Sequence, residues 1–254
     1  MLLFCRAQFY LRATQYGGRL TRNTETKEGI DKQFSLFYYS RMRFIIKLLP
    51  LLLASQMPAH VVSVYAAGLE SNLFPEDLSL RHIEHQGYSN LRSHVIYMKT
   101  LFMEYLAEQH RGKLALSHIY PSLVETNALY DENLPKWFKF IWRWLVAPFK
   151  QWLTVPPDEC GARIVLLATP RYPPRQTGTT GNVEAATTIE DGVEIAMGSD
   201  GVRGSGAYAL NWNGEPKEIK KAYEKFRRDE MTEKVWLHTM RAFEEIKAGN
   251  VFTG

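Results

Sequence analysis

Apolar side chains recur every three or four positions along two long stretches of the chain, residues 31–53 and 88–109. This period is typical of amphipathic helices, and Gly112 supplies a stop for the second one. Two short runs of β-branched and other apolar residues, "AHVVSVYAAG" and "KLALSHIYP", predict buried strands that end at Gly68 and Pro121. Helices and strands in this order predict an α/β fold with a doubly wound, Rossmann-like parallel sheet.

The loops that follow these two strands are expected to lie side by side. The carboxyl ends of neighbouring parallel strands share one edge of a sheet, and ligands bind in the crevice outside that edge. The polar stretch 69–87, which contains Pro75 and Gly87, is the first of these loops. Tyr88 opens the helix that follows it and is therefore expected to border the crevice.

The segment "KWFKFIWRWLVAPFKQWL", residues 136–153, differs in character, because four tryptophans alternate with lysine and arginine. Three interpretations are open. It forms a core helix whose cations extend to water, an apolar flap over the crevice, or a helix that lies in a membrane interface. Each predicts a different exposure for the aromatic side chains.

The remaining pattern completes the domain organisation. Residues 156–169 predict another helix on the sheet, residues 170–200 a long surface loop rich in Pro, Gly and Thr, and "GSGAYALNW" a last short strand. One or two amphipathic helices are expected in residues 215–248. We therefore expect an irregular N-terminus over 1–27, one α/β domain over 28–215 and a helical C-terminal extension over 216–254.

Composition narrows the class of protein. The net charge is +4 and the cations are scattered among acids, which argues against a nucleic-acid partner. No apolar run reaches the ~18 residues of a transmembrane span. Two cysteines, Cys5 and Cys160, favour a reducing compartment such as the cytoplasm, although four arginines before residue 25 leave a mitochondrial alternative. Neither cysteine has a second Cys or a His at metal-ligand spacing, and we interpret the seven histidines as structural or solvated, so no metal site is predicted.

One motif lies at the start of the second helix, where Tyr88 precedes Arg92 by four residues. Together with the strand that ends at Pro121, and with Thr126 shortly after it, this order of elements resembles the C-terminal two-thirds of the short-chain dehydrogenase/reductase family. The divergent fungal members, several of them from secondary-metabolite pathways, are the nearest. The family's first βαβ half, with its glycine-rich turn for the pyrophosphate, has no counterpart before residue 31, so the predicted sheet is incomplete.

The resemblance implies a site. Tyr88 would be the general acid, with Arg92 in place of the family's lysine as its charged partner. Pro121 and Thr126 would hold the nicotinamide end of NADP or NAD, while Ser122 replaces a family glycine. The substrate would be a small apolar ketone or alcohol.

Other positions depart from the family. Its serine falls at Ala66, with Ser63 earlier on the strand, and its asparagine falls at Phe37 or Tyr38. Tyr97 is an alternative acid, but Lys99 is only two residues from it and is expected to point elsewhere.

Three hypotheses about function follow. The first is an NAD(P)-dependent oxidoreductase, and the second is a catalytically inactive pseudoenzyme that acts as a binding partner. The third is a peripheral membrane protein held by residues 136–153. A homodimer through helices 31–53 and 88–109 is compatible with the first two, because these helices commonly form the family's dimer interface.

Overall fold

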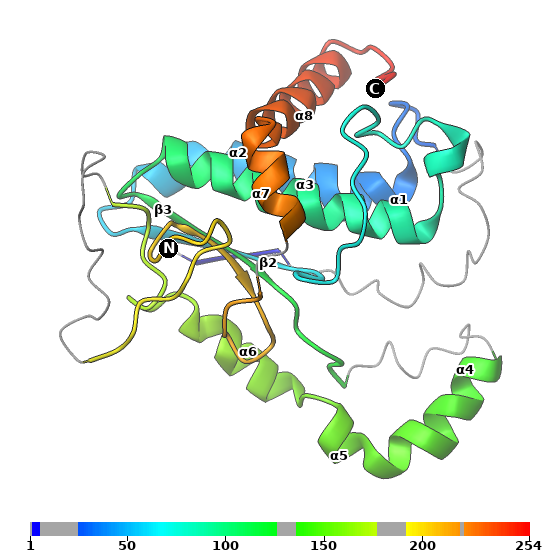
Figure 1. Ribbon diagram of the computed structural model, residues 1–254, viewed down its shortest axis with the longest axis vertical. Helices are drawn as coiled ribbons and strands as arrows, with labels where there is room; N and C mark the ends of the chain where they lie inside the picture. The colour runs from blue at the N-terminus through cyan, green and yellow to red at the C-terminus, as the bar shows by residue number, and fades with distance from the viewer. Residues whose placement is uncertain (1, 6–24, 126–135, 177–191, 219–220) are drawn as a thin grey trace.

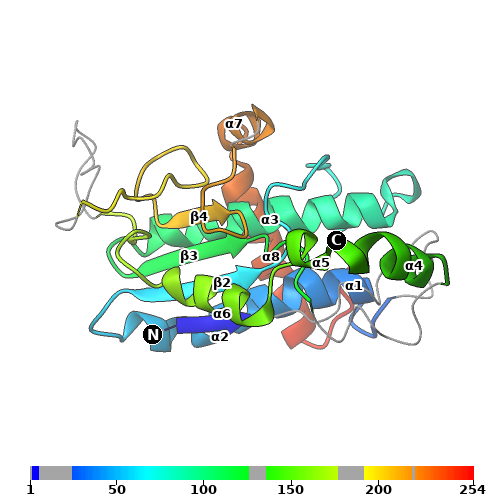
Figure 2. The same ribbon diagram turned by 90° about the horizontal axis from the view of Figure 1, so that it is seen from below.

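The computed structural model describes residues 2–5, 25–125, 136–176, 192–218 and 221–254. Four parallel strands form one sheet in the order β1-β2-β3-β4, and Figure 2 shows them side by side. These strands are β1 (Leu2–Cys5), β2 (Ala59–Val64), β3 (Leu114–Ile119) and β4 (Ala207–Leu210). The predicted α/β class and parallel sheet, a partial Rossmann-like fold, are confirmed.

Helices cover both faces of the sheet, as Figures 1 and 2 show. The strand residues alternate between two cores, because successive side chains of a strand point to opposite faces. Val61 and Leu116 pack in the larger core, under the long helices. Val62 and Ala115 pack in the smaller core against Ile164, which belongs to α6 (Pro157–Leu166). Burial on both faces explains why the strands read as continuous apolar runs.

The first predicted helix forms as three consecutive pieces, α1 (Lys32–Phe34), a π-helical turn η3 (Ser35–Tyr39) and α2 (Ser40–Leu53). Asp31 caps its start, and its Oδ1 accepts hydrogen bonds from the backbone N–H of Gln33 at 2.8 Å and Phe34 at 3.0 Å. Capping of this kind satisfies donors that have no partner within the helix. The prediction for residues 31–53 is confirmed.

The second predicted helix, α3 (Tyr88–Gln109), is confirmed over its whole length and lies largely buried between the sheet and the C-terminal helices. These are α7 (Lys221–Arg228) and α8 (Met231–Lys247). The Tyr38 hydroxyl lies 2.6 Å from Thr239 Oγ1 of α8, and the rings of Phe102 and Trp236 are 5.2 Å apart. The helical extension therefore covers part of the apolar surface that the sequence assigns to a dimer.

The N-terminal region contains a strand that the sequence pattern does not reveal. Leu2 pairs with His60 and Cys5 with Ser63, so β1 extends the sheet next to β2. A run of four apolar residues is too short to show a period, and its pairing partner identifies it only in three dimensions. Residues 6–24, the rest of the predicted irregular N-terminus, lie outside the described part of the chain.

Residues 136–153, called the aromatic arm below, form α4 (Lys136–Ile141), η6 (Trp142–Val146), η7 (Ala147–Phe149) and α5 (Lys150–Leu153). The arm extends beyond α6 at one end of the molecule (Figure 1). A short 3₁₀ turn, η4 (Ile83–His85), interrupts the loop before α3. Among the described helices, none combines the length and the apolar character that crossing a bilayer requires.

Candidate active site

The carboxyl ends of β2 and β3 lie together, as the sequence predicts. Val64 is the register partner of Ile119, and the Tyr65 N–H donates to the Ile119 carbonyl at 2.9 Å. On the other side the Tyr120 N–H donates to the Leu210 carbonyl of β4, also at 2.9 Å. The chain leaves all three strands at one edge, which is where a Rossmann-like sheet binds its ligands.

Tyr88 is the first residue of α3, and its ring packs partly buried against the larger core. Arg92 follows one helical turn later, so the two side chains lie on the same face. Burial raises the pKa of the Tyr88 phenol, and the positive charge of Arg92 partly opposes this shift. The phenol is therefore protonated at neutral pH and is suited to give a proton rather than to take one.

Arg92 is itself half-buried, and its Nε is a buried donor with no hydrogen-bond partner among the described residues. Buried donors are normally satisfied by an acceptor. An acceptor from a bound molecule would supply that missing partner. The guanidinium keeps the charge of the family's lysine but cannot release a proton.

The turn after β3 keeps the backbone conformation of a glycine at a position occupied by serine. Ser122 has φ 62°, in the left-handed region that glycine adopts most readily. Pro121, just before it, is half-buried at the strand end. The chain thus retains the Pro-Gly type of turn although its glycine is replaced. Thr126 lies outside the described residues.

The two remaining family positions hold no polar group that could reach a substrate. Ala66 and Phe37 are both buried. Ser63 is also buried within β2, and its Oγ has no hydrogen-bond partner among the described residues. Tyr38 uses its hydroxyl to bind Thr239 of α8. Among the described residues, neither of these two positions offers the hydroxyl or the amide that the resemblance places there.

The structure also brings two buried cations, Lys99 and Arg41, together around the ring of Tyr65. Lys99 is fully buried, and its Nζ lies 4.5 Å from the centre of the Tyr65 ring. Arg41 lies 5.6 Å from the centre of the same ring and donates to the Val64 carbonyl at 2.7 Å. Cations at these positions are attracted to the negative face of an aromatic ring. This group holds the first residues after β2 in place.

His118 of β3 belongs to the same buried group. Its Nδ1 lies 3.1 Å from Thr100 Oγ1, and its ring is nearly parallel to that of Tyr65. Burial, and then the charges of Lys99 and Arg41, hold the pKa of His118 well below its usual value, so the ring is neutral. One sign of this group in the sequence is Lys99, a cation at a position of the helix 88–109 that is buried. A charged residue on a helix is easily assigned to the solvent-exposed face instead.

Tyr97 and Lys99 point to different sides of α3, as expected from their spacing. The Tyr97 ring packs 4.8 Å from Tyr223 and 5.2 Å from Phe226, both on α7. Burial, followed by the charge of Glu70, raises the pKa of Tyr97 to about 12. Ionisation of Tyr97 is therefore disfavoured, and its contacts with α7 indicate that it serves as a packing residue.

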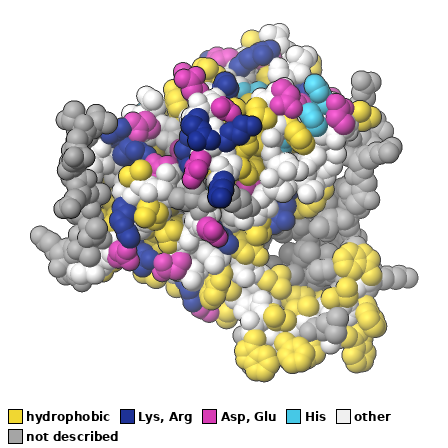
Figure 3. Space-filling view, viewed as in Figure 1, with side chains coloured by type: hydrophobic (Ala, Val, Ile, Leu, Met, Phe, Trp, Pro, Cys, Tyr) yellow, Lys and Arg dark blue, Asp and Glu magenta, His cyan; other side chains and the backbone are white. Residues whose placement is uncertain are grey.

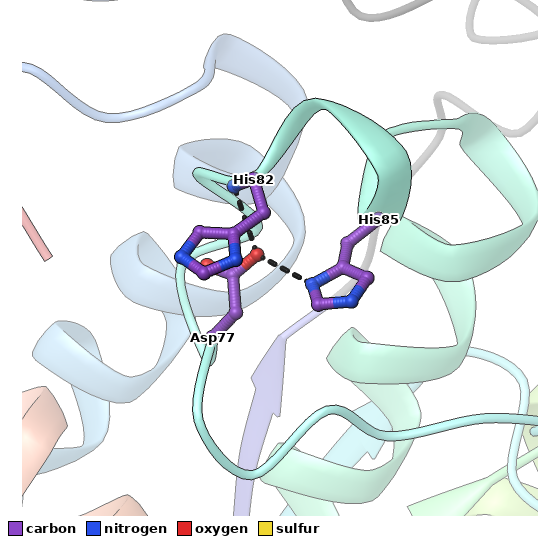
Figure 4. A group of neighbouring side chains, drawn as sticks. All are labelled: Asp77, His82 and His85. Carbon is purple, nitrogen blue, oxygen red and sulfur yellow. Dashed lines mark hydrogen bonds and ion pairs between the residues drawn. The ribbon is translucent and has the colours of Figure 1, made fainter.

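Asp77, His82 and His85 offer one ligand atom each within 4.8 Å of one another (Figure 4). The Asp77 carboxylate accepts hydrogen bonds from the N–H of Arg81 at 2.6 Å, from the N–H of His82 at 2.9 Å and from His85 Nδ1 at 2.9 Å. Structural zinc sites hold four protein ligands, and no fourth joins this group among the described residues. These hydrogen bonds account for the arrangement by fixing the loop that leads to Tyr88.

Comparison with known proteins identifies the relatives of the chain. It is 40% identical over 231 residues to oxidoreductase AN1596 of Emericella nidulans, across 91% of this chain and 66% of that protein. It is 35% identical over 227 residues to the short-chain dehydrogenase/reductase SAT2 of Stachybotrys chartarum, across 89% of this chain and 62% of that protein. Oxidoreductase andH of Emericella variicolor is 34% identical over 235 residues.

No protein-family model matches the chain. The chain spans about two-thirds of the length of the curated relatives it matches. Its relatives are fungal oxidoreductases, and one of them is named as a short-chain dehydrogenase/reductase.

Proposed function

We propose that this chain is part of an enzyme of the short-chain dehydrogenase/reductase family. The proposal rests on its sequence similarity to fungal oxidoreductases, one of which is named as a short-chain dehydrogenase/reductase. The enzyme uses NADP or NAD to reduce a ketone, or to oxidise the matching alcohol, on a small apolar molecule. The observation that carries the proposal is the placement of Tyr88 and Arg92, at the start of α3 and after the loop that leaves β2. Secondary metabolism is the setting that the resemblance suggests.

Tyr88 supplies the proton in this mechanism. In the direction of reduction, bound NADP or NAD would supply the hydride that reduces the carbonyl carbon. The Tyr88 hydroxyl gives its proton to the carbonyl oxygen, which becomes the alcohol. Burial raises the pKa of Tyr88, so the proton is present on the phenol before the reaction, but the same shift makes the phenol a weaker acid and leaves the charge of Arg92 to oppose it.

Arg92 stabilises the phenolate that Tyr88 leaves behind. Its charge is permanent, so it lowers the energy of the anion without relaying a proton. Solvent must then return the proton to Tyr88. The enzyme is therefore expected to be slower than one with a lysine at this position, whose ammonium can exchange protons.

The residues present fit one end of the cofactor. The left-handed turn at Ser122 and the buried Nε of Arg92 are two features that would hold the nicotinamide ribose. The pyrophosphate needs a glycine-rich turn at a helix N-terminus, and residues 1–30 contain no G-x-x-x-G-x-G motif. Binding of the whole cofactor is thus proposed for a longer product of the gene.

A pseudoenzyme is the second candidate function, and the residues at Ala66 and Phe37 favour it. Both side chains are buried and apolar where the family keeps a serine and an asparagine. A site retained for its chemistry needs the groups that stabilise the developing charge. In this reading Tyr88 and Arg92 are remnants of an ancestral site, and the chain acts by binding a partner.

The test is a cofactor titration and a reductase assay on the longest product of the transcript. We expect Tyr88→Phe to lower kcat at least about a hundredfold, because positioned acids contribute 10²–10⁴ in rate. Tyr105→Phe is the matched control, since it removes the hydroxyl of a half-buried tyrosine near the other end of the same helix.

Substitution of Arg92 separates charge from structure. Arg92→Lys keeps the positive charge and should retain or raise kcat. Arg92→Met removes the charge and should lower both kcat and the rate of proton transfer. A product that binds no nucleotide and shows no turnover would leave the pseudoenzyme as the function. An active product whose kcat is unchanged in the Tyr88→Phe variant would show instead that Tyr88 does not supply the proton.

A further inference from the structure

The aromatic arm carries most of the exposed aromatic surface of the described chain. Trp137, Phe140 and Trp144 are each exposed by 63–64%, and Trp152 by 75%. Outside the arm, Phe44 is the one exposed phenylalanine, tyrosine or tryptophan among the described residues. Figure 3 shows hydrophobic side chains gathered at the end of the molecule where the arm lies in Figure 1.

The exposed side chains follow helical spacing. Trp137, Phe140, Ile141 and Trp144 stand at positions i, i+3, i+4 and i+7, all of them exposed. This spacing normally marks the face of a helix that packs on a core. Here the face is turned to solvent, while Trp142, on another side of the arm, is buried. A continuous apolar face of exposed aromatic side chains on a protein surface indicates an interaction site.

The charges of the arm are all positive. Residues 136–153 contain four Lys and Arg and no Asp or Glu. Lys139, Arg143 and Lys150 are exposed, and Lys150 Nζ also reaches Glu125 Oε1 outside the arm at 2.9 Å. This cationic character complements the negative surface of a membrane that contains anionic lipids.

The combination of side chains favours a lipid surface over a protein partner. The cores of protein interfaces are depleted in lysine, whereas interfacial helices combine lysine and arginine with tryptophan and phenylalanine. Tryptophan is also enriched at the level of lipid headgroups. Within this chain the exposure of Trp137, Trp144 and Trp152 is not that of a core helix.

We propose that the aromatic arm docks on the surface of an anionic membrane. The apolar stripe of Trp137, Phe140 and Trp144 inserts among the headgroups, while Lys139 and Arg143 bind lipid phosphates. The docking is peripheral and does not depend on the oxidoreductase activity. It also brings the crevice near a source of apolar molecules.

Sedimentation of the 254-residue chain with phosphatidylcholine vesicles, with and without phosphatidylserine, tests this docking. We expect binding to the anionic vesicles that weakens as salt rises. The double variant Lys139→Gln, Arg143→Gln should lower the partition coefficient about 25-fold, since each cation contributes roughly a factor of five at an anionic surface. The triple variant Trp137→Ser, Phe140→Ser, Trp144→Ser should abolish binding.

The matched control is a triple variant that removes three exposed apolar side chains from another surface, Phe44→Ser, Leu51→Ser and Met57→Ser. It should bind vesicles as the unmodified chain does. If the two triple variants bind equally well, the arm is not the docking site and the proposal fails.

A measurement without substitutions covers the case in which a variant does not fold. Four of the six tryptophans lie in the arm, so brominated lipids that quench tryptophan fluorescence report its insertion directly. Quenching by anionic brominated vesicles supports the proposal. The absence of quenching overturns the proposal. If vesicles do not bind and the chain self-associates in a way that the triple variant of the arm abolishes, the arm is a contact between two copies of the chain.

Discussion

Removal of a single guanidinium should loosen the C-terminal extension from the domain. Glu104 lies on α3 with its side chain only 6% exposed. Arg227 of α7 donates to it twice, from Nε to Oε2 at 3.0 Å and from an Nη to Oε1 at 2.7 Å. The Ser199 hydroxyl gives a third hydrogen bond to Glu104, at 2.8 Å. Arg227→Met removes two of the three and leaves the carboxylate buried.

The expected magnitude follows from burial and hydrogen bonding. Breaking a buried ion pair by removing one partner costs about 3–5 kcal/mol, because a charge remains without compensation. Arg227 is about one-fifth exposed, and water can reach the gap that it leaves, so the lower end, about 3 kcal/mol, applies here. Replacing both residues removes the uncompensated charge. The double variant Glu104→Met, Arg227→Met should therefore lie within about 1 kcal/mol of the unmodified chain.

Urea unfolding of the four proteins in this cycle measures the coupling. The control is Arg241→Met, which breaks an exposed pair with Glu245 on α8 and should cost about 0.5 kcal/mol or less. The reasoning is refuted if Arg227→Met costs no more than this control. It is also refuted if the double variant loses the sum of the two single losses, since the ion pair would then contribute no coupling.

Two further predictions concern the turn after β3 and the loop before α3. Ser122→Gly should raise the free energy of unfolding by about 0.5–1 kcal/mol, because Ser122 has φ 62°. The control is Ser40→Gly, which should lower the free energy of unfolding because Ser40 has a helical conformation. Urea titrations in which both variants change the free energy of unfolding in the same direction would contradict the argument. Burial lowers the pKa of His94 to about 4, and its Nε2 accepts from the Phe74 N–H. The pKa of His94 is therefore lower in the folded chain than in the unfolded chain, where it is near 6.5. The contribution of neutral His94 to the free energy of unfolding is complete above pH ~6.5. It is lost as the pH falls toward 4, by up to about 3 kcal/mol. His94→Gln should flatten this slope of the urea midpoint with pH, and an unchanged slope would refute it.

The long helices and central strands could be predicted because their apolar patterns are long enough to show a period. Residues 88–109 match α3 residue for residue. The order of elements also predicted correctly that β2 and β3 end side by side. These features follow from which side chains must be buried, and the sequence pattern reports that directly.

The sequence pattern failed where a polar residue is buried or where an element is short. Lys99 and Arg41 lie inside the protein, where their charges face the Tyr65 ring. A pattern of apolar positions assigns such residues to the solvent face. β1 has four residues and gains its identity from pairing with β2. The group around Asp77 was missed because Asp77 and His85 are eight residues apart and meet only when the loop folds back.

The position of Tyr88 is set by this chain alone, and this bears on the predicted homodimer. α3 is held by the sheet on one side, by α8 through Phe102 and Trp236, and by α7 through Glu104 and Arg227. A dimer through the two long helices would have to use the side chains that remain exposed on the first of them, Leu36, Phe44 and Leu51. Because α3 needs no second copy to be buried, the start of α3 and its tyrosine keep their place in a monomer.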